Sequence, residues 1–196
     1  MNKTTKWIVI GIVALIAIWA FAGYNGMVSA DEDVTKAWNN VQSDYQRRAD
    51  LIPNLVETTK EAAKREQGIL EAVVNARAEA TSVQLTADEL TEENLKKFQQ
   101  AQSELSSSLS RLLMSVEAYP ELESIRGYGE LRASLEGTEN RIKESRNAFN
   151  ETVAVYNKKV RSFPNNLIAG MFGFSTRAGF TAAEGADQAP KVDFSE

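Results

Sequence analysis

The chain has no cysteine and no histidine among its 196 residues. These two absences exclude disulfide bonds, thiolate nucleophiles and zinc sites built from nitrogen and sulfur ligands. They also remove the commonest general base near neutral pH. Ferritin-like di-metal sites are excluded because they need a histidine three residues after a glutamate. Calcium-loop, dinucleotide and phosphate-loop patterns are missing as well. The sequence therefore predicts no enzyme, no metal site, no cofactor and no small-molecule substrate.

Positive charge is scarce in the body of the chain. The net charge is −5, and Lys3 and Lys6 are the only charged side chains before Asp31, so the rest is more acidic than the total suggests. Short basic pairs occur, but the sequence has no basic stripe of the kind that neutralises phosphates. We expect no binding to nucleic acid.

An uncharged apolar run occupies residues 7–30. At about 1.5 Å per residue, a helix over this run reaches roughly 36 Å, enough to cross a hydrocarbon core of about 30 Å. Trp7 and Tyr24 lie where aromatic residues meet the membrane interfaces. Residues 1–30 are predicted to be a transmembrane anchor and lipid to be a partner. A cleaved signal peptide is the alternative, since small residues precede Asp31. Lys3 and Lys6 predict a cytoplasmic N-terminus, with the body outside.

Residues 31–175 have the periodicity of long helices. Apolar positions recur at alternating steps of four and three, the spacing of a coiled-coil seam, beginning at Val34, Trp38, Val41, Tyr45, Ala49, Ile52 and Val56. This first helix is expected to run to about Ser82. A capping box at Thr86 and Glu89 predicts the start of a second helix, expected to return antiparallel from Asp88 to about residue 118.

A third helix is predicted from Leu131 to Pro164, and a short apolar fourth helix from the residues "NNLIAGMFGF". Residues 176–196 have no periodicity and are predicted to be an irregular tail. The expected fold is all-α: an N-terminal transmembrane helix, then an antiparallel bundle of three long helices and a short fourth helix.

The stretch "YQRRADLIPNLVE" combines charged residues and a proline with helical spacing. Pro53 costs a helix about 3 kcal/mol, yet the seam continues across it, so a kinked but continuous helix is expected. Arg47 or Arg48 is predicted to cap the C-terminal end of the second helix, with Asp50 pairing to the other arginine or a backbone donor. The alternative is a recognition patch for a partner, and the candidate polar cluster comprises Arg47, Arg48, Asp50, Pro53, Asn54, Glu139, Asn140 and Arg141.

Large apolar residues also gather near the C-terminus, in segments broken by glycine. They cannot all be buried along a helical seam, so they either cap the bundle or contact another subunit or lipid. The candidate contact residues are Met171, Phe172, Phe174, Phe180 and Phe194.

The motifs "YQRRADLIPNLV", "AYPEL", "TENRI", "VYNKKVRSFPNNLIA" and "APKVDF" occur in this order between residues 34 and 194. In these motifs and in its anchor the chain resembles the LemA family of bacterial membrane proteins. The resemblance implies a single N-terminal transmembrane helix, an antiparallel helical bundle and no established enzymatic activity. It also implies an association with membrane quality control through metallopeptidases.

Two functions remain open at this point. The first is a non-enzymatic scaffold that assembles with itself at the bacterial inner membrane. The second is an adaptor or sensor that binds a membrane quality-control partner such as a metallopeptidase, with Gly23, Gly26 and Pro53 as hinges.

Overall fold

The computed structural model describes residues 2–60, 67–117 and 127–181, and this part of the chain contains helices and no strand. The elements are α1 (Lys3–Thr59), α2 (Gln67–Ser82), the 3₁₀ helix η2 (Ala87–Glu89), α3 (Glu92–Glu117), α4 (Tyr128–Arg161) and α5 (Asn165–Phe172). The predicted all-α class, with a short apolar helix after the long ones, is confirmed.

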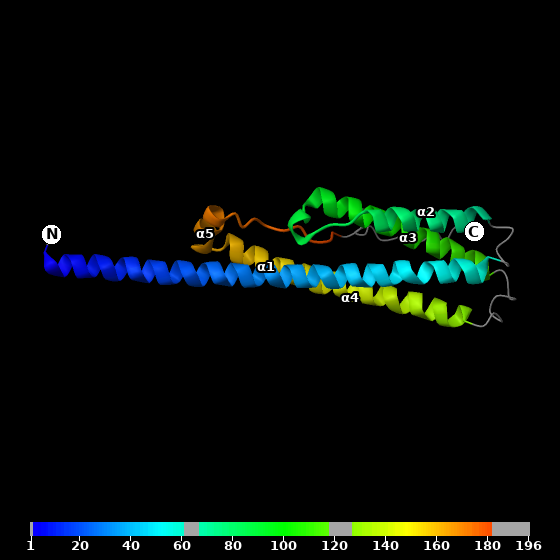
Figure 1. The fold of residues 1–196 in the computed structure, drawn as a ribbon, viewed down its shortest axis with the longest axis horizontal. Helices are drawn as coiled ribbons and strands as arrows, with labels where there is room; N and C mark the ends of the chain where they lie inside the picture. The colour runs from blue at the N-terminus through cyan, green and yellow to red at the C-terminus, as the bar shows by residue number, and fades with distance from the viewer. Residues whose placement is uncertain (1, 61–66, 118–126, 182–196) are drawn as a thin grey trace, which may run out of the picture.

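Helix α1 has 57 residues and is the axis of the molecule. Its N-terminal part projects alone, and its C-terminal part is surrounded by α2, α3 and α4 (Figure 1). Helices α2 and α4 run antiparallel to α1, whereas α3 runs parallel to it (Figure 1). The expected antiparallel bundle is therefore present.

The expected single helix through Ser82 is divided into two. Helix α1 ends at Thr59, and α2 begins at Gln67 and lies back against α1. The second predicted helix corresponds to α3. It runs antiparallel to α2 and parallel to α1, whereas it was expected to run antiparallel to the first helix. The seam could not reveal this reversal, because a heptad stripe has the same spacing in whichever direction the helix runs.

The predicted seams are buried in two clusters along the bundle. The cluster near the span includes Trp38 and Phe149, both 0% exposed. The distal cluster includes Ile52, Leu105 and Leu135. The third helix was expected to reach Pro164, but α4 ends at Arg161 and Phe163 is 81% exposed.

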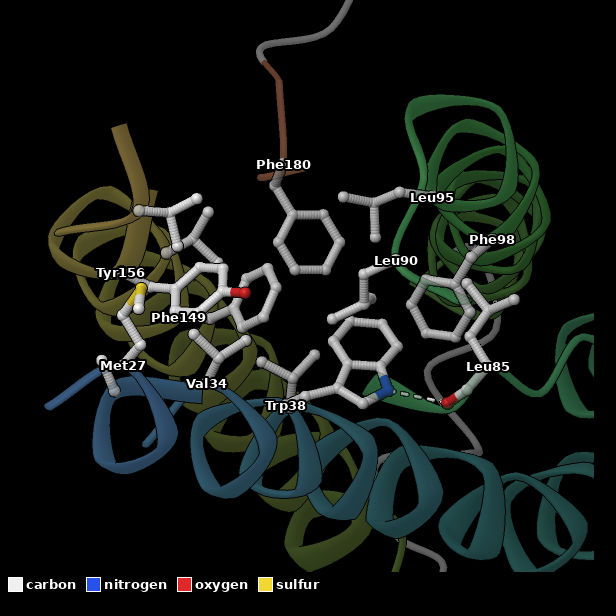
Figure 2. Close-up of a cluster of buried hydrophobic side chains, with 14 of the residues drawn as sticks. Met27, Val34, Trp38, Leu85, Leu90, Leu95, Phe98, Phe149, Tyr156 and Phe180 are labelled. Carbon is white, nitrogen blue, oxygen red and sulfur yellow. Dashed lines mark hydrogen bonds between the residues drawn. The ribbon is translucent and has the colours of Figure 1, made fainter. Parts of the chain in front are cut away.

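Trp38 organises the cluster near the span. Its indole packs edge-to-face with Phe98 and at a tilt against Phe149, with ring centroids 5.3 and 5.4 Å apart. Its Nε1 donates a hydrogen bond of 2.7 Å to the carbonyl oxygen of Leu85, which ties the loop after α2 to α1 (Figure 2).

The second predicted helix begins later than Asp88. The Glu89 carboxylate accepts hydrogen bonds from the backbone N–H and the hydroxyl of Thr86, but the turn that follows is the short η2. Helix α3 begins at Glu92, where the hydroxyl of Thr91 accepts the N–H of Asn94. The last turn predicted for this helix, beyond Glu117, lies outside the described residues.

The chain after α5 returns along the bundle in extended form as far as Thr181. Phe180 is 8% exposed and packs on Trp38, Phe98 and Phe149 (Figure 2). Of the two alternatives for Phe180, a cap of the bundle and an outward contact, the structure shows the ring packed within the bundle. Residues 176–181 form neither helix nor strand, as their lack of periodicity predicts, yet such a segment can still fill a groove between helices.

Candidate functional site

Arg48 is the most buried charged side chain of the polar cluster, with 2% of its surface exposed. Its Nη2 donates to the side-chain oxygen of Gln102 at 2.6 Å, and its Nη1 donates to the hydroxyl of Ser106 at 2.7 Å. Nη1 also pairs with the carboxylate of Glu139 at 3.1 Å. One guanidinium thus connects α1, α3 and α4.

This network lies between the two hydrophobic clusters. Tyr45 belongs to the cluster near the span and lies under the guanidinium, 5.1 Å from ring centroid to Cζ, while Ile52, one helical turn beyond Arg48, belongs to the distal cluster. Burial raises the pKa of the Tyr45 phenol, and the charges of Arg146 and Arg48 partly oppose that rise. The Arg48 network therefore forms a polar layer between the two hydrophobic clusters.

The predicted capping role is wrong for Arg48. Because α3 runs parallel to α1, Arg48 meets Gln102 and Ser106 in the middle of α3 and not its C-terminal end. The motif "AYPEL" lies outside the described residues. Asp50 accepts a hydrogen bond of 2.7 Å from the amide of Gln46, so its partner here is neither the second arginine nor a backbone donor.

The remaining members of the polar cluster do not join this network. Arg47, Asn54, Asn140 and Arg141 are exposed. Glu139 and Asn140 line one end of an open groove on α4 that continues to Arg146, Asn150, Phe180 and Thr181. The structure therefore separates the cluster into an ion pair between buried Arg48 and exposed Glu139, and residues that face solvent outside this pair.

Pro53 lies inside α1 with its ring exposed, and the helix continues through it. Proline has no N–H, so the carbonyl oxygen of Ala49, four residues earlier, loses its helical donor. The Nε of Arg77 on α2 donates to that oxygen at 2.8 Å. Pro53 thus leaves the carbonyl of Ala49 free to accept a hydrogen bond, and the bond from Arg77 holds α2 against α1. Sequence reasoning missed Arg77, because its partner depends on α2 turning back.

Two asparagines on α4 bind the extended C-terminal segment. The side-chain amide of Asn157 pairs with both the N–H and the carbonyl of Arg177, and that of Asn150 pairs with those of Phe180 in the same way. A Cβ on Gly179 would lie 2.9 Å from the Asn150 oxygen, so the close approach requires glycine there. In the sequence, the two asparagines are seven residues apart and each directly follows an aromatic seam residue. This spacing was the signal from which a contact on one face of α4 could have been predicted.

Arg177 connects the extended segment to two further elements. Its Nη2 pairs with Asp31 of α1 at 3.2 Å and with Asp88 of η2 at 2.8 Å. The contact with Asp31 lies directly beyond the apolar run. These ion pairs therefore hold the extended segment against α1 and η2 just after the apolar run.

Helix α5 packs beside the end of the span. Gly23 is so close to it that an added Cβ would meet Ile168 at 3.0 Å and Asn165 at 3.1 Å. The rings of Phe172 and Phe174 contact Tyr24, with centroids 5.0 and 5.7 Å apart. Met171 is 80% exposed and Phe172 59%. Phe194 lies outside the described residues.

Helix α1 is long and apolar enough at its N-terminal part to cross a membrane, and none of its most apolar stretch is buried in the protein. Trp7 is 74% exposed and Tyr24 37%, at either end of this stretch. Among the residues that the structure describes, no three acidic side chains gather closely enough to hold a metal ion.

These features define a membrane-associated helical-bundle protein with one candidate N-terminal span. The sequence pattern of the LemA family matches residues 37–194, so the chain belongs to the LemA family. The resemblance in the motifs is thereby confirmed.

Similar proteins include two magnetosome proteins. The chain is 27% identical to magnetosome protein MamQ 2 of Paramagnetospirillum magneticum, across 94% of this chain and 73% of that protein. It is also 27% identical to magnetosome protein MamQ of Magnetospirillum gryphiswaldense, across 85% of this chain and 67% of that protein. The similarity thus includes most of the chain.

Proposed function

We propose that this protein is a non-enzymatic scaffold, anchored by α1 in the bacterial inner membrane, that assembles with itself. The observation that carries the proposal is that α1 is both the candidate span and the central helix of the bundle. A bundle built on the same helix as its anchor is held at a defined height above the bilayer. Copies in one membrane are then restricted to similar heights and orientations, which lowers the entropic cost of lateral assembly.

The relatives support a role other than catalysis. Their names state a location, the magnetosome, and no reaction. The most buried charged group of the polar cluster is also engaged within the bundle: Nη1 and Nη2 of Arg48 are held by Gln102, Ser106 and Glu139. Groups engaged in this way stabilise packing and are not directed at a substrate.

The test is the mass of the full-length protein in mild detergent, measured by light scattering at two protein concentrations. A scaffold gives a defined oligomer at both. The comparison form lacks residues 1–22. It begins at Gly23 so that it keeps Met27, which is 0% exposed in the core, and Gly23, which packs on α5. If full-length protein is a monomer at both concentrations, self-assembly is wrong.

The second candidate is an adaptor or sensor that binds a membrane quality-control partner such as a metallopeptidase. It is favoured by the continuity of α1, which would carry a rearrangement of the bundle into the span. Of the expected hinges, Gly23 lies against α5, and the carbonyl of Gly26 accepts a hydrogen bond of 2.9 Å from Lys159. A monomer that gains mass only with a co-purified peptidase would favour this function.

We also propose that the N-terminus is cytoplasmic and the bundle lies outside, from the lysines before the span. Because the chain has no cysteine, a single Asn39→Cys substitution gives one exposed thiol on the bundle. A membrane-impermeant maleimide should label it in cells whose outer membrane has been opened. Labelling only after lysis of the inner membrane would reverse the orientation.

A further inference from the structure

Helix α5 is apolar on both of its faces. Ile168 and Ala169 point into the core and are 4% and 2% exposed. Leu167, Met171 and Phe172 face outward and are 59%, 80% and 59% exposed. The chain has no charged residue between Arg161 and Arg177. A helix that is hydrophobic all round belongs in a protein core or in lipid, and α5 has only one face in the core.

The position of α5 coincides with the end of the span. Met27 and Ala30 are 0% and 4% exposed in the bundle core, so the part of the apolar run that can face lipid ends near Tyr24. From Trp7 to Tyr24 a helix rises about 26 Å, close to the hydrocarbon thickness of about 30 Å. Since Gly23 and Tyr24 contact α5, its outward face lies where the membrane surface must be.

Basic residues lie next to this apolar face. Helix α4 ends with Lys158, Lys159 and Arg161 in its last turn, directly before α5. Lys159 binds the carbonyl of Gly26 on α1, whereas Lys158 and Arg161 are exposed. Cations beside an apolar surface at the end of a span suit the phosphates of anionic lipids.

We propose that α5, together with the exposed Phe163, inserts into the interfacial region of the bilayer that α1 spans, with Lys158 and Arg161 at the lipid headgroups. The occupant of this face is lipid and not a second copy, because the face is continuous with the lipid-facing surface of α1. This second membrane contact fixes the tilt of the bundle on the membrane. It stands whether or not the protein self-assembles.

The test places a nitroxide label on the full-length protein in phosphatidylcholine–phosphatidylglycerol vesicles and measures its accessibility to oxygen and to a water-soluble nickel chelate. The absence of cysteine makes Met171→Cys the single labelling site. The matched control is Met114→Cys, a methionine 62% exposed near the far end of α3. Leu15→Cys, in the span and 68% exposed, is the lipid standard.

We expect the label at residue 171 to be more accessible to oxygen than to the nickel chelate, with a ratio between those at residues 15 and 114, and the label at residue 114 to be more accessible to the nickel chelate. A ratio at residue 171 equal to that at residue 114 would place α5 in water and overturn the proposal. Low accessibility to both reagents would place it in a protein contact and overturn it as well. The mass measurement that tests self-assembly is independent of these ratios.

Discussion

Arg48 is a charged side chain held in the middle of a helical bundle by partners from two other helices. A buried charge that loses its partner costs far more than the same charge in water, because the interior solvates it poorly. The side chain of Arg48 is 3% exposed, whereas the side chain of its partner, Glu139, is 53% exposed. The two residues should therefore respond differently to substitution.

Replacement of Glu139 by alanine leaves Arg48 buried without a counter-ion, although Glu139 itself is a surface residue. We expect Glu139→Ala to lower the free energy of unfolding by about 2 kcal/mol, below the roughly 3–5 kcal/mol of a fully buried pair because water screens the exposed carboxylate. In an Arg48→Met background, the same substitution should cost almost nothing. Urea titration in mild detergent, followed by helical circular dichroism, measures both.

The matched control is Glu136→Ala, one turn earlier on α4. Glu136 pairs with Arg132 on the surface, and its side chain is 62% exposed. Its loss should cost less than about 0.5 kcal/mol. Equal losses for Glu139→Ala with and without Arg48 would contradict the account of the polar layer.

Phe180 is a core residue although it belongs to a segment without helical repeat. Its ring lies among Trp38, Phe98 and Phe149, and the guanidinium of Arg146 lies 4.4 Å above its centroid. We expect Phe180→Ala to lower the free energy of unfolding by about 3 kcal/mol, since it removes a buried ring and leaves a cavity. Val155→Ala, at a site on α4 that is 61% exposed, should change it by less than about 0.5 kcal/mol in the same titration. Similar losses at both sites would show that Phe180 is not packed in the core.

At the scale of the elements, Pro53 is tolerated in α1 because its ring has room and the carbonyl that it leaves without a helical donor finds another one. Its ring lies on the exposed side of the helix. The carbonyl that it releases, on Ala49, is satisfied by Arg77 of α2. The proline therefore specifies where α2 docks.

This relation predicts a coupling between Pro53 and Arg77. Arg77→Met should cost about 1 kcal/mol in the native chain, since it leaves a partly buried carbonyl without a donor. In a Pro53→Ala background the helix supplies its own N–H to Ala49, so Arg77→Met should cost much less. A double-mutant cycle of unfolding free energies measures the difference. Equal costs in the two backgrounds would refute the coupling.

The contact between α1 and α5 depends on the missing side chain of Gly23. Gly23→Leu would drive atoms into Ile168 and Asn165 and displace α5. We expect the amides of α5 to lose most of their protection in hydrogen exchange followed by mass spectrometry, with the rest of the bundle unchanged. Gly11→Leu is the matched control, because no atom lies within 4 Å of its added Cβ. Retained protection in Gly23→Leu would contradict the close packing.

At the scale of the whole molecule, the absence of histidine removes the side chain that usually titrates between pH 5 and 8. Burial raises the pKa of Tyr45 and of Tyr156. Their neutral forms are favoured in the folded state, so the stability they contribute is complete below the unfolded pKa of about 10 and is lost as the pH rises through the folded values.

We therefore expect stability that is nearly constant from about pH 6 to 9 and that falls above about pH 10. Melting temperatures across this range provide the measurement. Tyr45→Phe should make the alkaline fall shallower, because one of the two buried phenols no longer ionises. A steep change near pH 7, or an alkaline slope unaffected by Tyr45→Phe, would count against this assignment.

The sequence alone determined the features that depend on local spacing and on residue type. The uncharged run at residues 7–30 predicted the span, and the seam through Val34, Trp38 and Val41 predicted which face of α1 is buried. These signals are readable because a helix repeats every 3.6 residues and a bilayer has a fixed thickness. The family was also recognisable, since its motifs occur in order along the chain.

Only the tertiary structure decided the directions of the helices and the partners of the polar residues. A heptad stripe does not say whether α2 continues α1 or turns back, and that turn determines that Arg77 reaches Ala49 and that Arg48 reaches Gln102. A segment without a repeat likewise gives no local sign that Phe180 fills the core. Such contacts join residues far apart in the chain, so they are set by how the helices assemble and not by any one helix.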